Sequence, residues 1–125
     1  MAANKVIRFG PVYISNSIGN LLNCTVTSMT GPVGIIPTIA ALYMIVRHIR
    51  IVNKTTSAAT VILYIDSTGG STAGKEFLGG TLSVPANSAY DWYGMLRLDA
   101  ADFLTGIAGT ASALVIQGEG EVGVL

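Results

Sequence analysis

The residues best suited to chemistry form a glycine-rich segment at positions 69–75, GGSTAGK. This segment fits the first seven positions of a phosphate-binding P-loop, G-x-x-x-x-G-K, but the eighth position of a true P-loop is a Ser or Thr whose hydroxyl binds magnesium. Glu76 stands there instead, where its carboxylate would repel phosphates, and the FLGG that follows cannot form the long helix that holds them. The segment therefore predicts a turn between strands.

Two further sets of side chains could bind ligands. Asp91, Asp99 and Asp102 suggest calcium, but a calcium site needs several oxygens that converge from one short loop, so we expect structural roles for them. Tyr90 and Trp92 would share one face of a strand and could stack on a sugar. Because buried aromatic residues dominate cores and interfaces, packing is the favoured interpretation, and carbohydrate binding is the alternative.

Nucleophilic catalysis has little support in the sequence. His48 is the single histidine, and no G-x-S-x-G motif accompanies it. Cys24 is the single cysteine, so it forms no intrachain disulfide, and we expect it to be a small buried hydrophobe. The sequence therefore predicts a protein that is not an enzyme and has no cofactor and no metal site.

The only local excess of positive charge is formed by Arg47, His48, Arg50 and Lys54. Seven basic and seven acidic residues give the chain zero net charge, whereas nucleic-acid binding usually needs a basic patch. Strand alternation would also divide these four side chains between two faces. We therefore expect no nucleic-acid partner, and interpret these residues as solvated strand edges or interface pairs.

The elements that would position these residues are β-strands. Residues 41–66 contain two alternating apolar runs joined by a polar segment at 53–57, which predicts an antiparallel hairpin. Residues 99–104 are the one predicted helical turn, with Asp99 as its cap. The other predicted elements are a strand near 22–27, a loop at 28–37, a loop at 67–80, strands at 81–84 and 89–98, and closing strands at 113–117 and 121–125 separated by a bulge at Gly118 and Gly120.

These elements predict an all-β fold, a small β-sandwich with about 7–8 antiparallel strands, either jelly-roll or immunoglobulin-like. We predict two parts: an extended N-terminal arm at residues 1–20 and a single sandwich domain at residues 21–125. The opening MAANKVIRFG has no apolar signal core, so we expect synthesis in a cytoplasm.

The composition indicates a protein with a covered surface. Charged residues make up 11% of the chain, against about 25% in an average soluble domain. The longest apolar stretch, residues 33–46, is interrupted by Pro37 and is shorter than the roughly 20 residues that a spanning helix needs, so we expect no membrane association. A homo-oligomer or a component of a larger assembly explains the scarcity of charge.

Three segments carry a resemblance to a known family: RHIRIVNKTTSAATVILYI at 47–65, SVPANSAYDWYGMLRLDAADFL at 83–104 and ALVIQGEGEVGV at 113–124. Together they resemble capsid decoration proteins, also called head-stabilising or minor capsid proteins, of tailed bacteriophages. The resemblance implies a late structural protein of the virion, a β-sandwich that binds the outer surface of the capsid and stabilises the lattice. It also implies two partners: the major capsid protein, and further copies of the chain in a homotrimer.

Two sets of residues are our candidates for these contacts. The capsid-contact set lies in the arm and consists of Val6, Ile7, Phe9, Val12 and Tyr13. The subunit-interface set consists of Val33, Ile35, Ile36, Ile39, Leu42 and Tyr43. The alternative functions are a phage tail or baseplate component and a carbohydrate-binding β-sandwich module.

Overall fold

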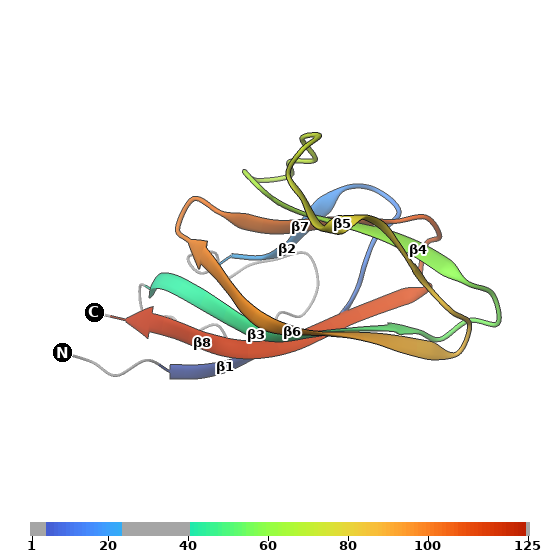
Figure 1. Ribbon diagram of the computed structural model, residues 1–125, viewed down its shortest axis with the longest axis horizontal. Helices are drawn as coiled ribbons and strands as arrows, with labels where there is room; N and C mark the ends of the chain where they lie inside the picture. Colours follow the sequence, from blue (N-terminus) through green and yellow to red (C-terminus); the bar gives the residue numbers. More distant parts are fainter. Residues whose placement is uncertain (1–4, 24–40, 125) are drawn as a thin grey trace.

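The structure, a computed structural model, describes residues 5–23 and 41–124 of the chain. These residues form eight strands in two four-stranded antiparallel sheets that face each other (Figure 1). The strands are β1 (Lys5–Tyr13), β2 (Gly19–Leu22), β3 (Ala41–Asn53), β4 (Ala59–Asp66), β5 (Glu76–Val84), β6 (Ser88–Asp99), β7 (Phe103–Ala108) and β8 (Leu114–Val124). The small antiparallel β-sandwich predicted from the sequence is confirmed.

The strand order identifies the sandwich as a jelly roll. One sheet has the order β1-β8-β3-β6 and the other β2-β7-β4-β5. The pairs β4–β5, β3–β6, β2–β7 and β1–β8 are all antiparallel, so the chain is one long hairpin that has been rolled up around the core. This order decides between the two types of sandwich that the sequence left open.

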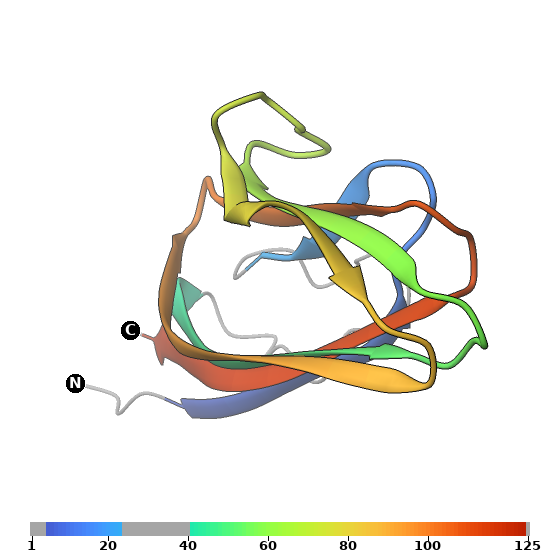
Figure 2. The ribbon, with the colours of Figure 1, turned by 45° about the vertical axis from the view of Figure 1, so that its right-hand side comes forward.

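The predicted hairpin at residues 41–66 is wrong in its pairing, although both of its strands exist. β3 and β4 belong to different sheets, and the segment between them crosses the edge of the sandwich (Figure 2). The buried Asn53 stabilises this crossing: its Nδ2 donates to Ser57 O at 2.8 Å and to Val84 O at 3.0 Å. A period of two predicts the strands, but it does not reveal which partner each strand pairs with.

The core lies between the two sheets and is formed by alternate residues of the strands. Each fully buried aliphatic or aromatic side chain contributes about 1.5–3 kcal/mol relative to an exposed one. The largest fully buried side chains are Phe9, Ile14, Leu22, Met44, Val46, Ile49, Ile51, Leu63, Leu98, Leu104, Leu114 and Ile116. No helix within residues 5–23 and 41–124 is long and apolar enough to cross a membrane.

A β-bulge at Arg47 interrupts the alternation of β3. Val46 pairs with Gly120 of β8 while His48 pairs with the adjacent Glu119, so Arg47 is an extra residue. As a result Val46 and Ile49, three positions apart, are both buried. The backbones of β3 and β8 approach each other closely at this point: a Cβ on Gly120 would lie 2.1 Å from the carbonyl oxygen of Ile45.

Residues 5–13 differ from the free arm expected from the sequence. They form β1, which pairs with β8 of the same chain from Lys5↔Val122 to Tyr13↔Val115. The ring of Phe9 covers Gly118, where a Cβ would lie 2.5 Å from the ring. Pro11 and Gly10 suggested irregular chain, but they occupy a register shift between Phe9 and Val12, which a strand can accommodate at a sheet edge.

Other boundaries also differ from the predictions. Residues 99–102 form a turn in which Asp102 N donates to Asp99 O, and β7 starts at Phe103, so the predicted helical turn is wrong. The two predicted closing strands are one strand, β8, and the bulge predicted there lies in its partner β3. The predicted loops at 28–37 and most of the strand near 22–27 lie outside the described residues, and β2 ends at Leu22.

Candidate docking face

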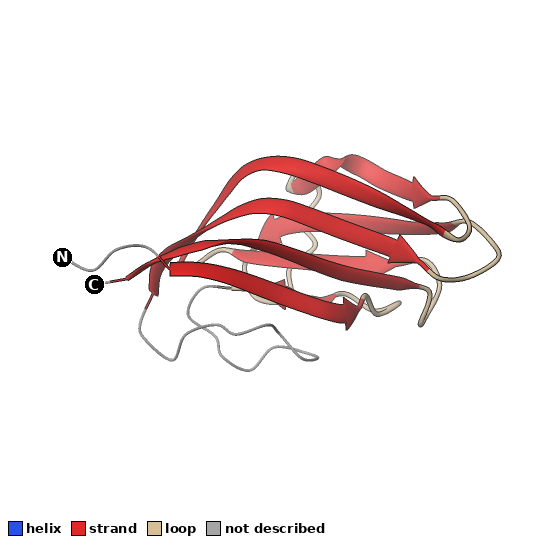
Figure 3. Cartoon of the chain, turned by 90° about the horizontal axis from the view of Figure 1, so that it is seen from below, coloured by secondary structure: helices blue, strands red, loops and turns tan. Residues whose placement is uncertain are grey.

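Figure 3 views the sandwich from the side of the sheet β1-β8-β3-β6, so the outer face of this sheet is toward the reader. Four large hydrophobic residues are exposed among the described residues: Val6 at 85%, Tyr13 at 47%, Tyr93 at 72% and Met95 at 68%. Val6 and Tyr13 belong to β1 and Tyr93 and Met95 to β6, the two edge strands of this one sheet. We call the outer face of this sheet the docking face.

The bulge at Arg47 brings the basic residues of β3 onto the docking face. Arg47 Nη2 lies 3.5 Å from Glu121 Oε1, while His48 and Arg50 approach Asp91. Strict alternation would have put Arg47 on the opposite face from His48 and Arg50, so the prediction that these side chains are divided between two faces is wrong. One extra residue changes the phase of the strand, and within β3 itself no residue marks its position; Gly118 and Gly120, which predicted a bulge, lie opposite in β8.

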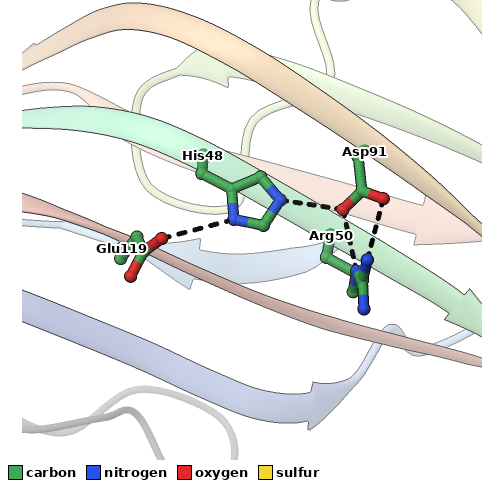
Figure 4. A network of polar contacts seen from close by, with 4 residues as sticks. All are labelled: His48, Arg50, Asp91 and Glu119. Carbon is green, nitrogen blue, oxygen red and sulfur yellow. Dashed lines mark hydrogen bonds and ion pairs between the residues drawn. The ribbon is translucent and has the colours of Figure 1, made fainter.

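An ion network joins three strands at the centre of the docking face (Figure 4). Arg50 donates two hydrogen bonds to Asp91, from Nε to Oδ1 at 2.8 Å and from Nη2 to Oδ2 at 3.0 Å. His48 Nε2 lies 2.8 Å from the same Oδ1, and His48 Nδ1 lies 3.6 Å from Glu119 Oε1. Such a bidentate pair fixes the planes of both groups and therefore the orientation of the side chains around them.

The electrostatics of the network keep its carboxylate ionised. The hydrogen bonds from Arg50 and then from His48 lower the pKa of Asp91 to about 2, and the same carboxylate raises the pKa of Arg50. An ionised carboxylate only accepts hydrogen bonds, so Nε2 of His48 must carry the proton in this contact. Tyr93 stacks on the imidazole with ring centroids 4.5 Å apart and an interplanar angle of 11°.

A shallow depression of about 230 Å³ lies beside the network. It is lined by Arg8, His48, Arg50, Gln117, Gly118 and Glu119. Its charged side chains come from three neighbouring strands, β1, β3 and β8, and Arg8 is the exposed basic residue on the β1 side. The arrangement can form salt bridges with a protein partner, because Arg8 and Glu119, paired across β1 and β8, offer both signs of charge.

The sequence-predicted capsid-contact residues are divided between the two faces of β1. Val6 and Tyr13 are exposed on the docking face, where Tyr13 receives a hydrogen bond from Lys54 Nζ. Ile7, Phe9 and Val12 are buried in the core of the chain itself, with exposed fractions of 5%, 1% and 9%. In this structure, therefore, only Val6 and Tyr13 of that set can contact a partner.

Most of the predicted subunit-interface residues cannot be placed. Val33, Ile35, Ile36 and Ile39 lie outside the described residues, and Leu42 is placed in β3 by its backbone alone. Tyr43 is half-buried at the start of β3, with the guanidinium carbon of Arg97 4.4 Å from its ring centroid.

The P-loop-like segment forms the loop between β4 and β5. The carboxylate of Asp66, 2% exposed, accepts hydrogen bonds from Ser67 N at 2.7 Å and Thr72 N at 2.8 Å, and Lys75 Nζ lies 3.3 Å away. The backbone hydrogen bonds from Thr72 and Ser67 strongly lower the pKa of Asp66. Lys75 is thus an internal partner of Asp66, and β5 follows at Glu76 where a P-loop would begin its helix.

The three aspartates for which we expected structural roles, not calcium binding, make contacts within the chain. Asp91 belongs to the ion network, and the Asp102 carboxylate accepts a hydrogen bond from Asp99 N at 3.0 Å in the β6–β7 turn. Trp92 packs on the inner side of β6, edge-to-face with Phe77 at 5.1 Å, as the packing interpretation predicted.

Sequence reasoning missed the ion network and the exposure of Tyr93 and Met95. The only available signal was that Asp91 and Tyr93 share a face of a strand, since their partners His48 and Arg50 are about forty residues away.

Comparison with known proteins gives no family. No family model matches the chain, and no curated protein matches it. Among solved structures, the chain is similar to one from a cryo-EM structure of the giant freshwater prawn Macrobrachium rosenbergii extra small virus (XSV) VLP, with a TM-score of 0.48 and 11% sequence identity. The match covers 98% of this chain and 79% of that chain. A likeness of this size carries no conclusion about function.

Proposed function

We propose that this protein is a structural component of a virus particle that binds the outer surface of a bacteriophage capsid and stabilises its lattice. The observation that carries the proposal is the docking face: all four exposed large hydrophobic residues of the described chain lie on one sheet, around a fixed ion network. Val6 and Tyr13 lie on one edge strand of this face and Tyr93 and Met95 on the other, so a partner that covers the whole face would bury both pairs. The sequence resemblance to phage decoration proteins supplies the partner, the major capsid protein.

The mechanism is equilibrium linkage and needs no catalysis. A protein that binds the assembled lattice but not its separated subunits stabilises the lattice by its binding free energy. Many copies on one particle act together, so modest individual contacts are sufficient. We propose the homotrimer and the position on the capsid exterior with it, on the resemblance alone.

A test on isolated capsids compares two faces of the sandwich. The double variant Val6→Asp/Tyr13→Asp places two negative charges on exposed positions of the docking face, and Ser83→Asp places one negative charge on an exposed position of β5 in the other sheet. We expect co-sedimentation of the double variant with capsids to fall at least about tenfold, since charge is depleted from interface cores, while Ser83→Asp binds like wild type. Equal loss or equal retention in both variants would refute the docking face.

A second candidate is a subunit that builds the shell itself. The jelly-roll strand order favours it, because jelly rolls form viral capsid domains as well as lectin domains. Electron microscopy of the purified chain separates the two functions: a shell-building subunit forms closed particles on its own, and a decoration protein requires a preformed capsid.

A further inference from the structure

Within residues 5–23 and 41–124, the outer edge of β6 has no partner strand. β6 pairs with β3 from Asn53↔Ser88 to Tyr43↔Asp99, with a register shift at which Gly94 and Met95 lie opposite Arg47 alone, and no strand of the described chain pairs with its other side. Half of the backbone N–H and C=O groups of an edge strand point away from its sheet. Among the devices that protect such an edge, the 12 residues of β6 include charged side chains and a register shift but no Pro and no Lys.

The same edge exposes apolar surface. β5 and β6 diverge from their shared turn (Figure 2). The side chains between them are only partly buried against the core: Phe77, Leu78, Leu82, Tyr90, Trp92 and Leu96. Tyr93 and Met95 add exposed surface on the docking face of β6. An unpaired backbone edge flanked by apolar side chains is the usual basis for strand addition.

We infer that β6 pairs antiparallel with β6 of a second copy of this chain, with Gly94 on the two-fold axis. The sequence around Gly94 is self-complementary in this register. The directly opposed residues are Asp91 with Arg97, Trp92 with Leu96, and Tyr93 with Met95, each pair occurring twice. Opposite charges and aromatic–apolar pairs are the cross-strand neighbours that stabilise antiparallel sheets.

Other registers are less favourable. A shift by one residue would place the inward-facing residues of one copy opposite the outward-facing residues of the other. A shift by two residues toward the C-terminus puts Asp91 opposite Asp99, which is repulsive, and the reverse shift leaves Asp91 opposite Met95. The charge pattern of β6 therefore selects the register centred on Gly94.

The residues nearest the axis are compatible with the close approach of two strands. Gly94 has no side chain, and the space that its Cβ would need is taken by the indole of Trp92, 2.7 Å away. The Arg97 side chain is 60% exposed and bonds Asp99 through Nε at 2.9 Å, and a guanidinium has further donors for a second carboxylate. In the paired strands, that second carboxylate belongs to Asp91 of the other copy, which Arg50 of the same copy already orients.

Pairing joins the two copies into one continuous eight-stranded sheet. Tyr93 and Met95 of both copies then meet at the centre of an enlarged docking face. The contact forms in the isolated protein, so its test does not depend on the proposed function, and a failure of either can be told apart from a failure of the other.

The first test is the mass of the purified chain by light scattering, at concentrations up to about 0.5 mM, above the Kd of specific interfaces. A two-fold contact gives an even multiple of 12.9 kDa, whether or not it also joins trimers. Arg97→Glu opposes two carboxylates at both pairs, so we expect at least about tenfold weaker association and half the mass. The control Arg47→Glu makes the same charge change on β3 and keeps the wild-type mass. A monomer or a trimer in the wild type overturns the inference.

The second test reads the register through disulfides, with Cys24→Ser as the background. Directly opposed residues of antiparallel strands have Cα atoms about 4.5–5.5 Å apart, within the range for a disulfide. A mixture of the Tyr93→Cys and Met95→Cys chains should yield the mixed disulfide, and neither chain alone should crosslink to itself. Crosslinking of either variant with itself would contradict a register centred on Gly94.

Discussion

Replacing Phe9 by Ala tests whether residues 5–13 are part of the sandwich or a free arm. Phe9 is 1% exposed, and its ring packs on the backbone of β8 at Gly118. Loss of a fully buried Phe side chain and the resulting cavity cost about 3–5 kcal/mol. Since domains of this size are stable by about 5–15 kcal/mol, the substitution removes a large part of the free energy of unfolding.

The matched control is Val6→Ala on the opposite face of the same strand. Val6 is 85% exposed, and substitutions at such positions change stability by less than about 0.5 kcal/mol. The assay is urea unfolding followed by the fluorescence of Trp92, the single tryptophan, which is partly buried and packs edge-to-face against Phe77. The midpoint should fall sharply for Phe9→Ala and remain unchanged for Val6→Ala.

The outcome that would refute this reasoning is equally clear. A cost below about 1 kcal/mol for Phe9→Ala, similar to that of Val6→Ala, is what a solvated arm would give. Residues 5–13 would then not be a strand of the folded monomer, and Ile7, Phe9 and Val12 would again be candidates for capsid contact beside Val6 and Tyr13.

Three further predictions follow from individual contacts. The contacts with Arg50 and His48 lower the pKa of Asp91 to about 2, so the ionised Asp91 stabilises the fold above its ordinary pKa near 4. This contribution is lost as the pH falls from about 4 to about 2. Asp91→Asn should therefore make the free energy of unfolding, measured by urea unfolding, less dependent on pH in that range. Gly120→Ala should lower the free energy of unfolding by at least about 1–3 kcal/mol in the same assay, because its Cβ would meet the Ile45 carbonyl. In the control Gly19→Ala the new Cβ meets only an oxygen at 3.9 Å, so the loss should be less than about 1 kcal/mol. Asn53→Ala should lower the melting temperature measured by circular dichroism, since it removes the buried donor of the Val84 carbonyl and so about 1–3 kcal/mol of the free energy of unfolding. A melting temperature within error of wild type would contradict the role given to this amide.

The sequence predicted the strands better than their partners. The alternation in 41–52 and 59–66 predicted β3 and β4. The face that Tyr90 shares with Trp92 in the sequence analysis is the inner face of β6. Pairing was not predictable, because a two-residue period is the same in a hairpin and in a crossing between sheets. The arm was misinterpreted because Gly10 and Pro11 indicate irregular chain, while the burial of Phe9 depends on β8, more than a hundred residues away.

The docking face was beyond sequence reasoning for a related reason. A single extra residue at Arg47 determines that Arg47, His48 and Arg50 share a face, and the glycines that predicted a bulge, Gly118 and Gly120, lie on the partner strand β8. The network on Asp91 then depends on the β3–β6 register, which joins positions about forty residues apart. The apolar residues Val6 and Tyr13 were identified, but their exposure could not be separated from the burial of their neighbours before the strand was known.

The copy number of this protein in purified virus particles tests the central proposal most directly. Quantitative mass spectrometry against the major capsid protein measures it without assuming a binding surface. A capsid-bound structural protein predicts a ratio near one, or a simple fraction of it. A handful of copies per particle would place the protein in the tail or at a vertex, and its absence from particles would contradict a structural role in the virion.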